Sequence, residues 1–289
     1  MSHFSVLVIS DNTNSVDDLM APYCEHDEYY FVFENKEDES RNEYENETVS
    51  AVRMPNGSIK FLYDEEFRVE GTIGSGKDTH RLPEELKEED IPLKEIYKTF
   101  GEFCRKYLCH EFDEDEQAWG YYHNPQSKWD YWSERYYLTL KEPREVPLDI
   151  EGLDDPYRDT RSALVKDLDF SVDENVVKLR KKQYDLLSTP VDEIEKQGKG
   201  IERINAFFAG KAVFDNCGSK EEFVSILSKF HTWAVVTPDG EWHEPGTMGW
   251  FGCSSGKPED EYVWMRDYYK NWIESANPKW TFTTLDCHI

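Results

Sequence analysis

Residues 237–255, TPDGEWHEPGTMGWFGCSS, bring a histidine and a cysteine together with four glycines and two tryptophans. A thiol beside an imidazole is the pair that nucleophilic catalysis uses, because the imidazole removes the thiol proton. Cys287 and His288 are neighbours at the end of the chain, but adjacent residues of a strand point to opposite faces. The conceivable nucleophilic set is therefore His243, Cys253 and one of these two. The alternative is that residues 237–255 form a packed structural corner.

Two further stretches match binding motifs only in part. Residues 71–78, GTIGSGKD, have the glycines and lysine of a phosphate-binding loop, but Asp78 stands where a hydroxyl should ligate magnesium. Cys104, Cys109 and His110 have a spacing that is poor for chelating zinc. Carboxylate pairs occur throughout the chain, so they identify no general acid and base. The sequence predicts no cofactor, no metal and no catalytic residue.

Net charge separates the classes of partner. The 289 residues include 60 Asp and Glu against 33 Lys and Arg, a formal net charge of −27. Such a surface repels nucleic acid and anionic membranes and attracts a basic protein surface. An aromatic content of 15% is too high for a disordered acidic chain. We expect a folded protein that binds neither nucleic acid nor membrane, whose acidic surface serves either solubility or a basic partner.

The cysteines and the N-terminus indicate the compartment. Six cysteines are scattered without the spacing of a disulfide framework, and MSHFSVLVIS has no basic region before its short apolar run. No segment approaches 18 apolar residues. We expect a cytosolic protein with reduced thiols.

Hydrophobic patterns predict strands at both ends of the chain, at 3–10, 231–237 and 279–289. Helical patterns cover residues 172–188, 191–210, 219–230 and 258–276. The predicted fold class is α+β, with a mixed or antiparallel sheet built from the N- and C-terminal strands, packed helices and an inserted β-ribbon. We expect a scaffold of residues 1–30 and 205–289, an acidic and aromatic region over 31–150, and a connector with a helical segment over 151–204.

The region 31–150 contains the less regular patterns. Residues 35–47, NKEDESRNEYENE, are predicted as an exposed acidic loop after a strand. Asn56 and Gly57 between two alternating runs predict a hairpin turn in a β-ribbon over 49–70. Apolar residues recurring at intervals of three and four predict one amphipathic helix over 91–112.

An acidic run beside aromatic residues marks this region as a candidate interface. Asp113, Glu114, Asp115 and Glu116 are expected to steer the approach of a partner. Aromatic side chains dominate the binding energy of interfaces, so four nearby rings are candidate anchors: Trp119, Tyr121, Tyr122 and Trp129. The alternative is that these rings face the core.

Five stretches spread over the chain form a combination of motifs: MSHFSVLVISD, LMAPYCEHDE, NPQSKWDYW, AVVTPDGEWHEPGTMGWFG and TTLDCHI. The combination resembles a family of conserved small proteins of tailed phages. That family usually continues the central motif with a glycine pair and Arg-Trp, whereas residues 133–137 here are SERYY. In length and acidity the chain is similar, more loosely, to the phage anti-defence proteins that inhibit the bacterial Gabija system, a nuclease–helicase complex that degrades phage DNA.

The resemblance implies a non-enzymatic inhibitor in the host bacterial cytoplasm. Its partner would be a host defence protein with a basic DNA-binding surface, whose DNA binding or cleavage it blocks, and a homo-oligomer is compatible with this role. Two alternatives stay open. One is an enzyme or binding protein that acts on a nucleotide or small signal molecule through the glycine and aromatic corner, and the other is a structural protein of the virion.

The same resemblance gives the corner a structural role as a family motif. Asp239 and Gly240 predict a hairpin turn, and the later glycines allow the backbone to turn tightly around aromatic side chains. The residues of this structural motif are Asp239, Gly240, Trp242, Gly246, Gly249, Trp250, Phe251 and Gly252.

Overall fold

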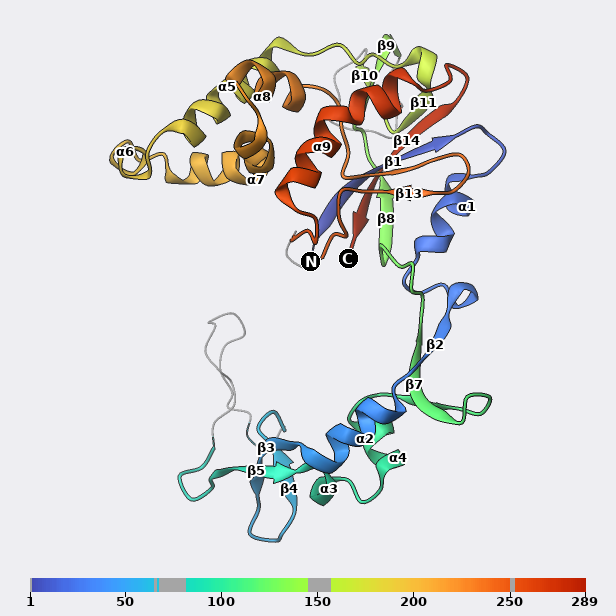
Figure 1. The fold of residues 1–289 in the computed structure, drawn as a ribbon, viewed down its shortest axis with the longest axis vertical. Helices are drawn as coiled ribbons and strands as arrows, with labels where there is room; N and C mark the ends of the chain where they lie inside the picture. Colours follow the sequence, from blue (N-terminus) through green and yellow to red (C-terminus); the bar gives the residue numbers. More distant parts are fainter. Residues whose placement is uncertain (1, 65–66, 68–81, 145–156, 250–252) are drawn as a thin grey trace. The chain divides into compact units, whose positions relative to one another are not determined.

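The computed structural model describes residues 2–64, 67, 82–144, 157–249 and 253–289 (Figure 1). Its helices and its mixed and antiparallel sheets define an α+β protein, as the sequence predicts. The chain forms two compact units, one made of residues 1–27 with 126–289 and the other of residues 28–125. We call them unit 1 and unit 2.

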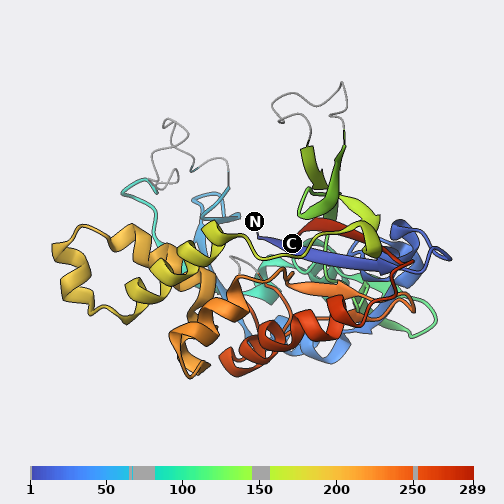
Figure 2. The same cartoon turned by 90° about the horizontal axis from the view of Figure 1, so that it is seen from above.

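Unit 1 is built on a six-stranded sheet with the N-terminal strand β1 (His3–Ser10) near its centre. All eight residues of β1 pair antiparallel with β14 (Thr281–His288), and β12 (Ala234–Val236) pairs in parallel on the other side. The other strands are β13 (Trp242–His243), which pairs with β12, and two strands that share the outer edge of β14, β11 (Ser162–Leu164) and β8 (Tyr131–Glu134). The two termini therefore lie side by side, as both views show (Figure 1, Figure 2).

Each face of this sheet carries its own apolar cluster, because alternate residues of β1 point to opposite faces. The first cluster contains Phe4, Val6 and Val8 of β1 with Leu285, Cys287 and the Leu19 and Met20 side chains of α1 (Val16–Met20). The second contains Leu7, Ile9 and Phe282 with Tyr268 of α9 (Pro258–Tyr268) and Ile273 of the π-helical segment Tyr269–Glu274. On this second face β1 also presents His3 and Ser5, so its apolar residues give way to polar ones toward the N-terminus.

Four helices at one side of the sheet form a further cluster in unit 1. They are α5 (Glu174–Ser188), α6 (Val191–Lys196), α7 (Gly200–Asn216) and α8 (Lys220–Leu227). Gly210 lets α7 approach α8 closely, because a Cβ at this position would lie 2.6 Å from a methyl carbon of Leu227. Strands β9 (Leu138–Arg144) and β10 (Tyr157–Thr160) form a separate two-stranded sheet, with a short 3₁₀ turn (Val165–Asp167) after β11.

Unit 2 contains two three-stranded antiparallel sheets. One has the order β2 (Val32–Asn35), β7 (Ala118–His123), β6 (Glu111–Asp113), and the other has the order β4 (Ile59–Phe61), β3 (Thr48–Arg53), β5 (Glu88–Pro92). The core between them is formed by Leu93, Tyr97, Phe103, Cys104 and Trp119. The predicted hairpin turn is present, because Gly57 has a φ of +82° and Met54 accepts its N–H at 2.8 Å.

The prediction of a loop over 35–47 is wrong, because α2 (Glu37–Asn46) occupies most of it. The Asn35 side chain accepts the Glu37 N–H at 3.0 Å, and Arg41 pairs with Glu37 one turn earlier. Tyr44 anchors the helix, since its ring centroid lies 5.5 Å from that of Phe103 in the core. A strongly acidic sequence is therefore helical where one partly buried aromatic side chain packs against the core, which periodicity did not detect.

The single helix predicted over 91–112 is instead two short helices, α3 (Leu93–Ile96) and α4 (Phe100–Lys106). Tyr97 has an extended backbone, and Thr99 begins the second helix by accepting the Glu102 N–H at 3.1 Å. Leu93 and Phe103 lie in the same core, so the apolar spacing correctly predicts which side chains are buried. It does not predict the break between the two helices at Tyr97.

The boundaries of the compact units differ from the expected regions. Residues 126–144 belong to unit 1 because β8 pairs with β14 and Leu138 of β9 is buried in the second cluster. The described residues of 151–204 also belong to unit 1, since Leu186, Leu187 and Ile194 pack with α7 and α8. Residues 145–156 and the whole GTIGSGKD stretch, residues 71–78, lie outside the described part of the chain.

Gly120 should be essential for unit 2, because a Cβ there would lie 2.0 Å from the Glu34 carbonyl oxygen across the β2–β7 pair. We expect Gly120→Ala to destabilise this pairing by about 2 kcal/mol, which raises hydrogen exchange in β7 about thirtyfold. The control is Gly200→Ala in α7, where no atom lies within 4 Å of the new Cβ. Equal exchange in β7 for Gly120→Ala and wild type would contradict the close approach.

Candidate functional site

Three of the motif stretches meet at one end of the unit 1 sheet. The register places His3 of β1 opposite His288 of β14, and His288 opposite Tyr131 of β8. Ser5, Asp286 and Ser133 form the next row on the same face. Residues from MSHF, KWDYW and LDCHI, which are far apart in sequence, thus form one polar cluster.

The centre of this cluster is a histidine bound to a carboxylate. His288 Nδ1 lies 2.7 Å from Asp130 Oδ1 and 2.8 Å from Oδ2, so Nδ1 carries the proton that it donates to the carboxylate. This leaves Nε2 as the free ring nitrogen, and it is buried without a hydrogen-bond partner among the described residues. The hydroxyl oxygen of Ser133 is likewise buried and has no hydrogen-bond partner among the described residues. Buried polar atoms without partners are rare enough to mark a site.

A second histidine and an arginine complete the cluster. His3 Nδ1 lies 3.3 Å from Asp286 Oδ2, and Arg135 Nη2 donates to the same oxygen at 3.2 Å. The rings of His3 and His288 are 5.1 Å apart in an edge-on arrangement. Cys287 is absent from this cluster because it points into the apolar core, where burial raises the pKa of its thiol. A nucleophilic pair of Cys287 and His288 is thereby excluded, as the strand alternation predicted.

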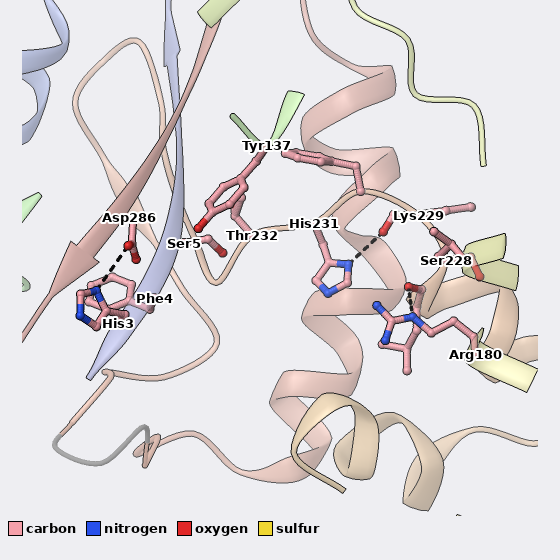
Figure 3. A pocket seen from close by; sticks show the side chains of 13 residues that line it. His3, Phe4, Ser5, Tyr137, Arg180, Ser228, Lys229, His231, Thr232 and Asp286 are labelled. Atoms are coloured by element: carbon pink, nitrogen blue, oxygen red, sulfur yellow. Dashed lines mark hydrogen bonds and ion pairs between the residues drawn. The ribbon is translucent and has the colours of Figure 1, made fainter. Parts of the chain in front are cut away.

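A cleft of about 670 Å³ opens beside this cluster, within unit 1 (Figure 3). We call it the sheet-end cleft. His3 and Asp286 lie at one end, and Arg180 and His231 lie at the other (Figure 3). The wall between them includes Phe4, Ser5, Tyr137, Leu227 and Thr232.

The helical end of the cleft carries positive charge. Arg180 of α5 donates through Nε to the Leu227 carbonyl at 2.9 Å and through Nη1 to Gln183 Oε1 at 2.8 Å. His231 Nδ1 lies 2.9 Å from the Lys229 carbonyl, so it is the donor there. Burial lowers the pKa of both Arg180 and His231, because each charge is partly removed from water.

The sequence did not indicate the sheet-end cleft. His3, Asp130, Asp286 and His288 occur in the quoted motifs, but no spacing shows that they meet. Arg180 has no sequence signal at all, because only the packing of α5 against the end of α8 brings it there.

The described part of the glycine and aromatic corner is a structural support. Gly240 has a φ of +85° in the turn after β12, Asp239 Oδ1 accepts the Thr237 hydroxyl proton at 2.6 Å, and the Tyr23 hydroxyl donates to the Gly240 carbonyl at 2.6 Å. Trp242 packs on Tyr23 with ring centroids 4.9 Å apart. A Cβ on Gly246 would lie 2.2 Å from the Gly256 nitrogen, so the loop closes on itself.

His243 and Cys253 have different surroundings in the described part of the corner. Gly249 donates its N–H to the Cys253 carbonyl at 2.8 Å, while the Cys253 side chain is exposed. The His243 ring packs on Trp272 with centroids 4.8 Å apart. Trp250, Phe251 and Gly252 lie outside the described residues.

The residues of the partial zinc motif lie in different environments. Cys104 is buried in the unit 2 core, which raises its pKa to about 11, whereas Cys109 is exposed. His110 Nδ1 lies 3.2 Å from Ser40 Oγ. Among the residues that the structure describes, no group of three His, Cys, Asp or Glu is arranged to hold a metal ion.

The acidic run is a surface turn between β6 and β7. Asp113 Oδ1 accepts the N–H groups of Asp115 at 2.9 Å and Glu116 at 2.6 Å, and Asp113 Oδ2 accepts the Tyr122 hydroxyl proton. The Tyr122 hydroxyl, followed by the Glu116 N–H, holds the pKa of Asp113 below its usual value. Glu114, Asp115 and Glu116 are exposed, as the predicted steering role requires.

Two of the four predicted aromatic anchors are buried. Trp119 is 9% exposed in the unit 2 core, and Trp129 is 8% exposed in the first cluster of unit 1. For these two rings the alternative of a core position is correct, because each fills space between strands and helices. Tyr122 is 44% exposed and Tyr121 is half-buried.

Tyr121 and Tyr122 instead line a hollow of about 550 Å³ in unit 2, which we call the acidic hollow. Its other residues are Glu28, Phe31, Cys109 and Glu111. Neither glutamate forms an ion pair among the described residues. Tyr121 and Tyr122 are adjacent in β7, so their rings point to opposite faces of the strand, and Tyr122 shares its face with Glu111. The hollow therefore combines two carboxylates that form no ion pair among the described residues with tyrosine at its wall, a combination that suits a cationic side chain.

Comparisons with family models, curated proteins and solved structures found no match. Among the described residues, no helix combines the length and apolar character that crossing a membrane requires. The function must therefore be inferred from the geometry of the molecule itself.

The corner is held to the KWDYW stretch by an ion pair that can be tested. Lys128 Nζ lies 2.7 Å from Glu244 Oε1, and the Glu244 side chain is only 10% exposed. We expect Lys128→Met to cost about 2 kcal/mol in urea unfolding, because it leaves this carboxylate without its cation.

Adding Glu244→Gln to Lys128→Met should recover part of that loss, since the uncompensated charge is then removed. Lys106→Met serves as the control, because its pair with Glu102 is a surface pair worth less than about 1 kcal/mol. Additive effects of the two substitutions in the double variant would contradict a coupled pair.

Proposed function

We propose that this protein acts by binding rather than catalysis, and that unit 2 binds a basic surface of another protein. Following the resemblance, we propose a phage-encoded anti-defence inhibitor that works in the host bacterial cytoplasm. Its partner is a Gabija-type nuclease complex, whose DNA binding or cleavage it blocks by occupying the basic DNA-binding surface.

The acidic hollow is the observation that carries this proposal. Glu28 and Glu111 line it together with Tyr121 and Tyr122, so a Lys or Arg side chain that enters finds opposite charge beside an aromatic side chain. The exposed turn of Glu114, Asp115 and Glu116 follows β6, the strand that contains Glu111.

Long-range charge favours the same partner. Residues 28–125 include 25 Asp and Glu against 12 Lys and Arg, so this third of the chain carries about half of the net charge of −27. A field of this sign accelerates encounter with a basic surface, and added salt weakens it.

The tyrosines are held in place before a partner arrives. The Tyr121 hydroxyl donates to Glu34 Oε2 at 2.8 Å, and the Tyr122 hydroxyl donates to Asp113. Each bond raises the pKa of its tyrosine, because the nearby carboxylate disfavours the phenolate. Fixed rings lose less conformational entropy on binding, which leaves more of the contact energy as affinity.

A reconstituted nuclease–helicase complex of the Gabija type tests the proposal. We expect the protein to inhibit DNA cleavage, and we expect Glu114→Lys/Asp115→Lys/Glu116→Lys to weaken inhibition about tenfold or more and to reduce its salt dependence. Asp113 is left unchanged because it organises the turn.

The matched control reverses three exposed acidic residues of α6 in unit 1, Asp192, Glu193 and Glu195. It changes the net charge equally, so it should leave inhibition within about twofold if the location of the charge matters. Equal loss of inhibition in both variants would show that only net charge matters, which contradicts a binding role for this turn. The absence of inhibition by the wild-type protein would overturn the proposal.

A further inference from the structure

We propose that the sheet-end cleft of unit 1 binds a small phosphorylated molecule, with the phosphate held at the Arg180 and Lys229 end. This site lies in the other unit from the acidic hollow and does not depend on the function proposed above. It also differs from the glycine and aromatic corner, for which the sequence left a small-molecule pocket open as an alternative to a structural role.

Arg180 is the first reason. Its guanidinium is substantially buried, and its two hydrogen bonds go to neutral acceptors, the Leu227 carbonyl and Gln183 Oε1. A guanidinium has five N–H donors, so three remain for another acceptor. A partly buried charge without a counter-charge is costly, and an anion in the cleft would supply one.

The segment after α8 adds further groups on the same side. Lys229 Nζ lies 5.1 Å from the centroid of the Tyr269 ring, and no carboxylate among the described residues forms an ion pair with it. The Ser228 hydroxyl oxygen is buried and has no hydrogen-bond partner among the described residues. Ser228, Lys229 and Arg180 all line the cleft, so this end combines two cationic residues with an unsatisfied hydroxyl.

This local charge is unusual for the molecule. The chain carries a net charge of −27, yet the described residues that line this end of the cleft include no carboxylate. Arginine and lysine together are the usual ligands of phosphate, and a planar guanidinium matches its oxygen atoms. The cleft is therefore a place where an acidic protein can hold an anion.

The rest of the cleft suits the body of such a ligand. Its volume of about 670 Å³ falls within the range of small-molecule sites. Tyr137 and Val176 provide aromatic and apolar wall, and the Asp286 carboxylate at the far end can accept hydroxyl protons from a ligand. A nucleotide-sized phosphate ester fits this distribution of charge better than free phosphate.

Isothermal titration calorimetry of the full chain with AMP and ribose 5-phosphate tests the site, with adenosine as the probe that lacks phosphate. We expect at least one phosphate ester to bind with a Kd below about 1 mM, and adenosine to bind at least about tenfold more weakly than AMP. Lys229→Gln should weaken the phosphate ester about tenfold, because it removes a charge-assisted contact.

Lys178→Gln is the matched control, since Lys178 lies on α5 like Arg180 but is exposed and outside the cleft lining. It should change the Kd by less than about twofold. Arg180→Lys keeps the charge and the bond toward Leu227, and it should also weaken binding because the planar fork is lost.

Three results would overturn the proposal. They are the absence of binding by both phosphate esters, equal affinity for AMP and adenosine, and equal weakening by Lys178→Gln and Lys229→Gln. Because Lys229 is exposed, Lys229→Gln is expected to fold normally, so a loss of binding there reports on the site.

Discussion

The antiparallel pairing of β1 with β14 is the interaction on which unit 1 depends. It joins the two ends of the chain along eight residues, and the alternation of β1 distributes apolar side chains to clusters on both faces of the sheet. The same register sets His3 beside His288 and brings Asp130 to them through β8. The polar cluster and one end of the sheet-end cleft are consequences of that one pairing.

The candidate sites of the two units have opposite charge. Unit 2 carries about half of the net charge of −27, together with tyrosine rings that their own hydrogen bonds hold in place. Unit 1 has two cations at the edge of a cleft, Arg180 and Lys229, that form no ion pair with a carboxylate among the described residues. An acidic surface suits a basic macromolecular partner, and a cleft of the other sign suits the small anion that we propose for it.

Local patterns failed where a few tertiary contacts decided the outcome. Residues 37–46 have the composition of a loop, but they are helical, with Tyr44 packed against the core and Glu37 paired with Arg41. The stripe from Leu93 to Leu108 was interpreted as one helix, but the extended backbone at Tyr97 and the cap at Thr99 divide it. Trp119 and Trp129 were offered as anchors because a sequence does not show which face of a strand is covered.

The sequence by itself determined the α+β class, the strands at both termini, the Asn56–Gly57 and Asp239–Gly240 turns, and the position of the acidic run on the surface. These features follow from short-range periodicity, backbone freedom and charge, which depend only on residues close together in the sequence. Only the tertiary structure decided that His3, Asp130 and His288 meet, and that Arg180 faces a cleft. Those groups are separated by more than a hundred residues or lie on different elements, so the register of β1 with β14 and the packing of α5 against α8 place them.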